Sequence, residues 1–118
     1  MDNESGLVAL GALSQPTRLE AFRLLVLHEP EGLLAGEIAR RLGVPHNTMS
    51  THLAILSRAG LVSCQKQSRT MTYRAHLPSV RDLVVYLLRD CCGGRPELCA
   101  PLIEDLTPCC QRKGADCG

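Results

Sequence analysis

The strongest constraint on the fold is a pair of short predicted helices with a glycine turn between them. The first spans residues 34–42 and is closed by Gly43; the second spans residues 45–59 and is stopped by Gly60. Glycine commonly follows a helix because it adopts the left-handed backbone conformation without steric cost. Two short helices joined by such a turn are arranged in the order of a helix-turn-helix unit.

The two predicted helices have apolar and polar sides. At 100° per residue, Met49, Leu53, Leu56 and Gly60 fall on one narrow face of the second helix, which predicts its burial. Its opposite side carries small or hydrogen-bonding residues with one charge: Asn47, Ser50, Thr51, Ala54 and Arg58. In the first helix Ile38, Ala39 and Leu42 are predicted to point inward, and Arg40 and Arg41 outward. The outer face of the second helix is therefore the candidate binding surface.

The flanking segments complete a mainly α fold with a small β-hairpin. Residues 6–13 are predicted to form a helix, and a second helix begins at Pro16 and ends before Pro30. Residues 61–67 and 70–75 alternate as two strands around a tip at Ser68-Arg69, which places a wing after the helix pair. A last helix starts at Pro78 and Ser79. We expect a winged helix-turn-helix domain over residues 1–92 and a Cys-rich tail over residues 93–118.

The last predicted helix carries a wide apolar stripe. Its members recur at helical spacing: Val80, Leu83, Val84, Leu87, Leu88 and Cys91. Val85 and Tyr86 widen this stripe beyond what one domain face needs, so part of it is predicted to pair with another subunit.

Charge and composition favour a nucleic-acid partner. Between Gly36 and His76 the chain has six basic residues against one acid, a net charge of +5, while the rest has seven basic residues against eleven acids, a net charge of −4. A basic block inside a nearly neutral chain is typical of polyanion binding. With three aromatic residues and no Trp, base stacking on aromatic platforms is close to excluded.

Nothing in the sequence predicts export or membrane insertion. No apolar run approaches the length of a membrane span, and the start of the chain, Met1-Asp2-Asn3-Glu4, lacks the basic and apolar regions of a secretion signal. We therefore expect a cytoplasmic protein without a membrane partner, whose thiols are kept reduced.

Six of the seven cysteines form a pattern that is written twice near the end of the chain. The two copies are Cys91-Cys92-x6-Cys99 and Cys109-Cys110-x6-Cys117. Three converging thiolates suit a thiophilic ion, and a trigonal pyramid of sulfurs suits arsenite or antimonite, whereas zinc would want a fourth ligand. The first copy is the predicted metal site and the second a candidate second site. Cys64 stands alone in a predicted strand, where we expect a packing residue.

Several motifs together resemble the ArsR/SmtB family of winged-helix repressors that respond to metals and metalloids. They are Gln15-Pro16-Thr17-Arg18-Leu19, Leu42-Gly43-Val44, Met49-Ser50-Thr51-His52-Leu53, Ala59-Gly60-Leu61-Val62 and Tyr73-Arg74. The resemblance covers about residues 7–92. It implies a homodimer, assembled through the first and last helices, that binds palindromic operator DNA and is released when an inducer binds.

The sequence departs from two inducer sites of this family. Residues 36–56 contain no cysteine, so the Cys-x-Cys site of many arsenic-responsive members is missing. Asp82 has no downstream histidine, so the zinc site of other members is missing too. The thiol clusters resemble instead the C-terminal three-cysteine site of a subgroup of arsenic repressors. As(III), with Sb(III) as an alternative, is therefore the predicted inducer, and no organic cofactor is expected.

The predicted DNA contacts follow from placing the second helix of the pair in the major groove. His46 and Asn47 lie at the end that meets base edges, and an asparagine can pair with adenine through two hydrogen bonds. Ser50 and Thr51 are expected to bond bases or phosphates. The basic residues are expected at phosphates: Arg41, Arg58, Lys66 and Arg69. For His52 we expect only a bond to a neighbouring backbone group.

Three other functions fit parts of the sequence. A redox sensor of the same fold would form disulfides from its vicinal thiols under oxidant. A structural zinc tail on a constitutive regulator would use the same cysteines. A thiol enzyme is the weakest alternative, because the chain has no Cys-x-x-Cys and no Gly-rich cofactor loop.

Overall fold

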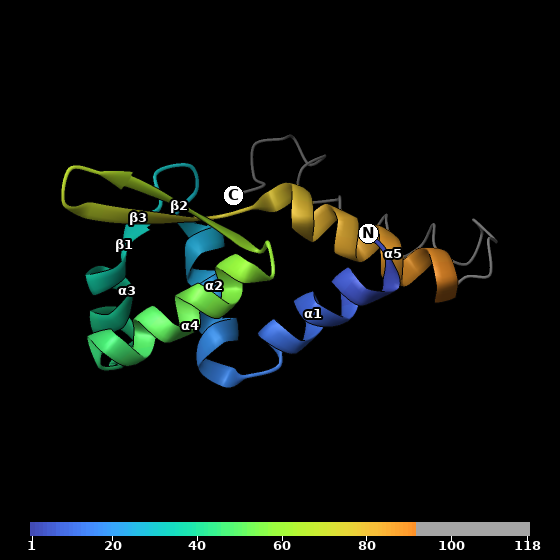
Figure 1. Cartoon of the computed structure of the whole chain (residues 1–118), viewed down its shortest axis with the longest axis horizontal. Helices are drawn as coiled ribbons and strands as arrows, with labels where there is room; N and C mark the ends of the chain where they lie inside the picture. The colour runs from blue at the N-terminus through green and yellow to red at the C-terminus, as the bar shows by residue number, and fades with distance from the viewer. Residues whose placement is uncertain (92–118) are drawn as a thin grey trace, which may run out of the picture. The chain divides into compact units, whose positions relative to one another are not determined.

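The structure is a computed structural model of the chain, and it describes residues 1–91, with side-chain surroundings through Leu88. Within these residues the elements follow in the order α1 (Asn3–Leu13), α2 (Pro16–Leu27), β1 (Leu33–Leu34), α3 (Ala35–Leu42), α4 (His46–Arg58), β2 (Val62–Gln67), β3 (Thr70–Ala75) and α5 (Leu77–Cys91) (Figure 1). The predicted winged helix-turn-helix class is confirmed: α3 and α4 form the helix pair, and β2 and β3 form the wing.

Two compact units divide the chain, Met1–Leu83 and Val84–Gly118, so their boundary falls within α5. The first unit contains every element from α1 to β3 together with the start of α5. The predicted boundary between residues 92 and 93 lies beyond the described part of the chain and stays a prediction. No helix in the described part is long and apolar enough to cross a membrane.

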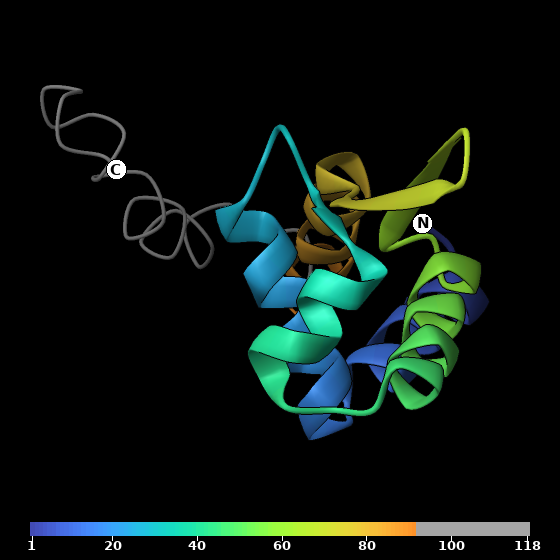
Figure 2. The same ribbon diagram turned by 90° about the vertical axis from the view of Figure 1, so that its left-hand side faces the viewer.

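The core of the first unit is almost entirely aliphatic. Its largest fully buried side chains are Leu25, Ile38, Met49, Leu53, Leu56 and Leu61. They come from α2, α3, α4 and the turn before β2, and Figure 2 shows α3, in teal, beside α2, in blue. The prediction is confirmed for Met49, Leu53 and Leu56 of α4 and for Ile38 and Ala39 of α3, which are buried. Leu42 is half-buried, and Gly60, which follows α4, is exposed.

Side-chain caps fix where the first two helices begin. The Oδ1 atom of Asp2 accepts a hydrogen bond from the backbone N–H of Ser5 at 2.7 Å, so α1 begins at Asn3, earlier than predicted. This hydrogen bond holds the pKa of Asp2 below its usual value. The Oε1 atom of Gln15 accepts from the N–H of Arg18 at 2.7 Å, and α2 begins at Pro16 as predicted.

A short strand precedes the helix pair where the sequence predicts the start of a helix. Leu33 pairs with Tyr73 and Leu34 with Thr72, so β1 adds a third, antiparallel strand to the wing in the order β1-β3-β2. Leu34 thus belongs to β1, and α3 begins at Ala35. A two-residue strand has no period to detect, and only its pairing with β3 defines it.

Candidate nucleic-acid interface

The exposed face of α4 is the centre of the candidate interface. His46, Asn47 and Thr51 are exposed and Ser50 is half-buried, while the opposite face of the helix lies in the core. The first turn of α4 contains no acidic residue. This end of the helix, with its positive dipole, is suited to approach a polyanion.

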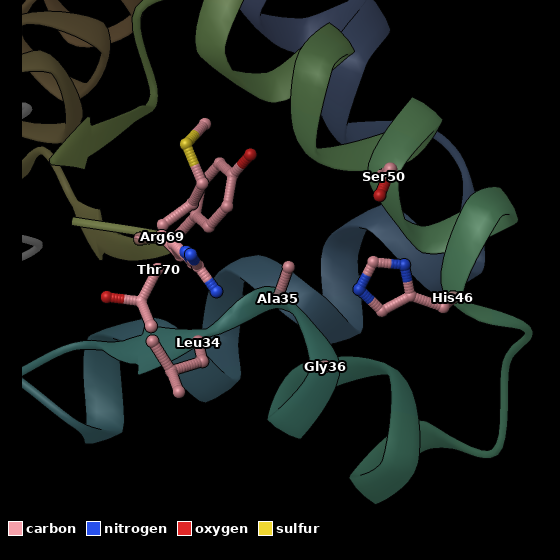
Figure 3. A pocket seen from close by; sticks show the side chains of 9 residues that line it. Leu34, Ala35, Gly36, His46, Ser50, Arg69 and Thr70 are labelled. Carbon is pink, nitrogen blue, oxygen red and sulfur yellow. The ribbon is translucent and has the colours of Figure 1, made fainter. Parts of the chain in front are cut away.

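A groove of about 480 Å³ separates the beginnings of α3 and α4 from the wing. It brings together three residues that the sequence singles out for DNA binding: His46, Ser50 and Arg69. Figure 3 shows His46 and Ser50 on α4 across the groove from Arg69 and Thr70, with Leu34, Ala35 and Gly36 along its floor. Met71 and Tyr73 of β3 complete the wall. The tertiary structure thus makes one surface from segments that are distant in the sequence.

The His46 imidazole lies close to Gly36 of α3. A Cβ atom at position 36 would lie 3.7 Å from Cδ2 and 4.0 Å from Nε2 of His46, which is ordinary contact distance. The ring therefore lies beside the first turn of α3 and lines the groove. In this position His46 belongs to the groove as much as to the outer face of α4.

Two other polar side chains of α4 are engaged with its own backbone. The Oδ1 atom of Asn47 accepts from the N–H of Thr48 at 2.9 Å, and the Thr51 hydroxyl donates to the carbonyl oxygen of Asn47 at 3.3 Å. A two-point contact with adenine needs both the oxygen and the nitrogen of the Asn47 side-chain amide. The side-chain oxygen has two lone pairs, so its bond to Thr48 leaves one acceptor position for that contact.

The wing carries its predicted basic residues on exposed positions. Lys66 pairs with Met71 across β2 and β3, and Arg69 lies at the two-residue tip beside Ser68, whose φ is +56°. Alternate residues of a strand share one face of the sheet, so Lys66 and Cys64 share one face of β2. Lys66 is thus a second exposed cation of the wing, on the strand that leads to the tip.

The other basic residues of the central block have different surroundings. Arg41 is exposed, with Nη1 3.3 Å from Nε2 of His28 at the end of α2. Arg74, although close in sequence to the wing tip, donates from Nη2 to Oε1 of Glu29 at 2.9 Å, and this partner raises its pKa. The charge of Arg74 is thus compensated by Glu29 of the same domain. Arg58, the last residue of α4, lies about 18 Å along the helix from His46.

Two expectations from the sequence are wrong. Cys64 is exposed rather than packed in the core, with Sγ 3.9 Å from Sδ of Met71, because its strand lies at the edge of the sheet beyond the core. His52 bonds a side chain rather than a neighbouring backbone group: its Nδ1 lies 3.4 Å from Nη1 of Arg18. Arg18 is distant in sequence, and nothing in the local pattern around His52 indicates this contact.

The predicted metal site lies almost wholly outside the described residues. Of its three cysteines, Cys91 is described as part of α5, without its side chain, and Cys92 and Cys99 are not described. The candidate second site, Cys109, Cys110 and Cys117, is also outside the described residues. Among the residues that are described, no group of three or more His, Cys, Asp or Glu side chains is placed to hold a metal ion. Both thiol sites therefore stay predictions.

Comparisons with known proteins find similarity to helix-turn-helix proteins and transcriptional regulators. Residues 13–65 match a family described as a helix-turn-helix domain. The chain is 31% identical over 91 residues to the transcriptional activator HlyU of Vibrio cholerae, covering 77% of this chain and 82% of HlyU. A solved structure of that HlyU aligns with a TM-score of 0.60 at 31% identity, over 78% of this chain and 99% of HlyU.

Two further solved structures have the same fold. An ArsR-like transcriptional regulator from Rhodococcus sp. RHA1 aligns with a TM-score of 0.68 at 27% identity, over 87% of this chain and 92% of that one. A homodimeric winged helix-turn-helix DNA-binding domain from Mycobacterium bovis aligns with a TM-score of 0.61 over 72% and 77% of the two chains; its identity of 22% supports the fold alone. Sequence and fold together place the chain in the ArsR/SmtB family of winged-helix transcriptional regulators, as a DNA-binding regulator.

Proposed function

We propose that this chain is a metalloid-responsive repressor, which binds operator DNA as a homodimer and leaves it when three thiolates bind As(III) or Sb(III). The observation that carries the proposal is the Cys91-Cys92-x6-Cys99 pattern at the end of a DNA-binding domain of this family. HlyU is named an activator. Repression is therefore part of the proposal rather than a property of every relative.

The proposed operator contacts use the groove and the outer face of α4. His46 and Asn47 approach base edges, Ser50 and Thr51 bond bases or phosphates, and Arg69 with Lys66 contacts the backbone beside the wing. The positions of His46, Ser50 and Arg69 around one groove support a common interface. In this proposal Arg41, near the end of α3, contacts a phosphate, and so does Arg58 at the far end of α4.

The proposed homodimer would cover exposed apolar residues of α1 and α5. In α1, the exposed fractions are 58% for Leu7 and 36% for Leu10, and in α5 Val85 is 51% exposed. These side chains favour burial against another surface. The M. bovis domain of the same fold is homodimeric, which is consistent with a second copy as the partner.

The proposed sensor uses Cys91, Cys92 and Cys99 as three ligands of one ion. Adjacent residues of a regular helix diverge by 100°, so Cys91 and Cys92 converge only if the helix unwinds after Cys91, where Gly93 and Gly94 permit it. A reversal of the chain at Pro96 would then bring Cys99 near Cys91 and Cys92. Because the ligands are thiolates, protons leave on binding and apparent affinity rises with pH.

Release follows if ion binding reorganises the end of α5, since α5 is part of the proposed dimer contact. A changed dimer contact alters the spacing of the two α4 helices, which must match successive major grooves about 34 Å apart. Coupling free energies are typically about 1–3 kcal/mol, so a fully emptied operator needs a coupling near or above the top of this range.

The test is fluorescence anisotropy of the reduced protein on a labelled duplex from its own upstream region. Arsenite, zinc and peroxide are titrated separately into the wild type, Cys99→Ser and, as a matched control, Cys64→Ser. We expect arsenite to release the wild type and Cys64→Ser but not Cys99→Ser. Release of Cys99→Ser by arsenite, or no release of the wild type, contradicts the three-thiol sensor.

A redox-sensing repressor of the same fold is the second candidate. The exposed position of the Cys64 thiol in the wing favours it, because an accessible thiol beside the DNA-binding groove would react with an oxidant. This alternative predicts release by peroxide without arsenite. If Cys64 is the reactive thiol, Cys64→Ser abolishes that response, whereas a response from the C-terminal thiols survives the change.

A further inference from the structure

A second pocket lies on the side of α4 away from the wing, between α4, α1 and the start of α2. Its volume is about 280 Å³. Two arginines, Arg18 and Arg58, line it together with the aliphatic residues Val8, Ala12 and Ile55. None of these residues lines the groove beside the wing. The pocket lies wholly within the unit Met1–Leu83.

Neither guanidinium in this pocket faces a carboxylate among the described residues. The ion pairs found there join Arg74 to Glu29 and Arg81 to Asp82. Arg18 instead donates from Nε to the carbonyl oxygen of Ala12 at 2.6 Å and contacts His52 through Nη1. Arg18 is half-buried and Arg58 is exposed, and within residues 1–88 neither forms an ion pair with a carboxylate. Two arginines that line one pocket without a carboxylate partner favour the binding of an anion there.

The rest of the lining determines what kind of anion fits. Val8, Ala12 and Ile55 present aliphatic surface and no polar side-chain atom, so a bare phosphate would leave this surface against water. A carboxylate matches the fork geometry of guanidinium groups. The volume lies just below the usual range of ligand pockets, about 300–1,000 Å³. We propose that this pocket binds a small organic anion, a carboxylate with a short aliphatic body.

The position of the pocket couples such a ligand to DNA binding. Arg18 joins the end of α1, at Ala12, to α4, at His52, and a carboxylate at Arg18 would alter this link. Because α4 carries the proposed base contacts, ligand and DNA would change each other's affinity by the same factor. This consequence rests on the proposed function, whereas binding of the carboxylate itself does not.

The experiment measures binding by NMR on the full, reduced chain, labelled with ¹⁵N and free of DNA and arsenite. Hexanoate is the probe, and hexanol and inorganic phosphate are titrated in parallel. We expect saturable amide shifts centred on Gly11, Arg18, Ile55 and Arg58 with hexanoate alone. If hexanol bound as tightly as hexanoate, the arginines would not be needed for binding. If phosphate bound as tightly as hexanoate, the aliphatic lining would not be needed. No saturable shift with hexanoate, or shifts centred on the wing groove, would overturn the site.

Two variants locate the ligand without disturbing the core. Arg58 is exposed, and Arg58→Gln should weaken hexanoate binding by about tenfold or more, the loss expected for one charge-assisted contact. Gly11→Leu should also weaken it, because Gly11 lines the pocket and a Cβ there meets no atom within 4 Å, so the new side chain has room to occupy the space.

Arg23→Gln is the matched control, since Arg23 is an exposed arginine of α2 outside the pocket lining. Its hexanoate affinity should equal that of the wild type. Unchanged affinity in both Arg58→Gln and Gly11→Leu would overturn the proposal. Because DNA is absent throughout, a negative result here leaves the arsenite test of the proposed function unaffected.

Discussion

The guanidinium of Arg18 lies 3.4 Å from Nδ1 of His52, and it thereby connects the first turn of α2 to the middle of α4. The same side chain donates from Nε to the carbonyl oxygen of Ala12 in the last turn of α1 at 2.6 Å. One arginine thus joins three helices. Since a guanidinium only donates, Nδ1 of His52 must be the acceptor in this contact.

Arg18→Ala should lower the free energy of unfolding by about 1–3 kcal/mol, because it leaves the half-buried acceptors at Ala12 and His52 without this donor. Urea unfolding monitored by circular dichroism measures the change. The exposed Arg23 of the same helix serves as control, and Arg23→Ala should change stability by less than about 0.5 kcal/mol. Equal effects of the two substitutions would mean that the Arg18 contacts contribute nothing specific.

Gly32→Ala should destabilise the domain more than Gly43→Ala. Both glycines have positive φ, +78° and +68°, and an alanine there costs about 1–2 kcal/mol in backbone strain. A Cβ at position 32 would also lie 2.5 Å from the Tyr73 carbonyl oxygen and 2.6 Å from Cγ of Arg74, whereas at position 43 it meets no atom within 4 Å.

The clash beside β3 raises the expected cost of Gly32→Ala to about 2–5 kcal/mol. Thermal and urea unfolding of the two variants give the comparison. Similar losses at both positions would show that the backbone between α2 and β1 moves to accommodate the methyl group.

Arg69→Ala should weaken binding to any duplex and reduce the salt dependence of that binding. Each phosphate contact contributes a slope of about 0.9 in a plot of log affinity against log salt, so the slope should fall by about this amount. A duplex of unrelated sequence is sufficient, because phosphate contacts do not depend on sequence. Arg81→Ala, an exposed arginine of α5, is the control, and an unchanged slope in Arg69→Ala would rule out the phosphate contact.

Leu7→Glu should convert the proposed homodimer into monomers. Leu7 is 58% exposed on α1, and a charge there would be buried in the proposed subunit contact. Leu27→Glu is the control, since Leu27 is 79% exposed on α2, outside that contact. Analytical ultracentrifugation measures the mass of each variant. A dimer that survives Leu7→Glu would place the subunit contact elsewhere.

Stability should decline above pH 10 through Tyr73. Burial raises the pKa of Tyr73 above its ordinary value of 10.0, and the nearby Cys64 thiol raises it further. The unfolded state then loses the phenolic proton at a lower pH than the folded state does, so the free energy of unfolding falls as pH rises past 10.

A Tyr86→Phe background leaves Tyr73 as the single tyrosine, and its ultraviolet absorbance follows the ionisation. The midpoint should lie above that of the urea-unfolded chain and should decrease in Cys64→Ser. A folded-state midpoint equal to the unfolded one would contradict the effect of burial.

The fold was largely predictable because its signals are local. Each of these signals acts within one or two turns of a helix. They are the glycines after α3 and α4, the proline at the start of α2 and the apolar period of α4. The two strands of the wing are also evident from their alternation around Ser68-Arg69. The site was predictable in part: the polar face of α4 follows from its sequence, whereas the exposure of Cys64 does not.

The sequence by itself determined the helix pair, the wing, the basic central block and the repeated thiol pattern, because periodicity, turn residues and composition are properties of neighbouring positions. Only the tertiary structure decided that Arg74 is paired with Glu29, that His52 contacts Arg18, that β1 joins the wing, and that His46 and Arg69 line one groove. Each of these joins residues that are distant along the chain, and packing of the buried core brings them together, so no local pattern encodes them.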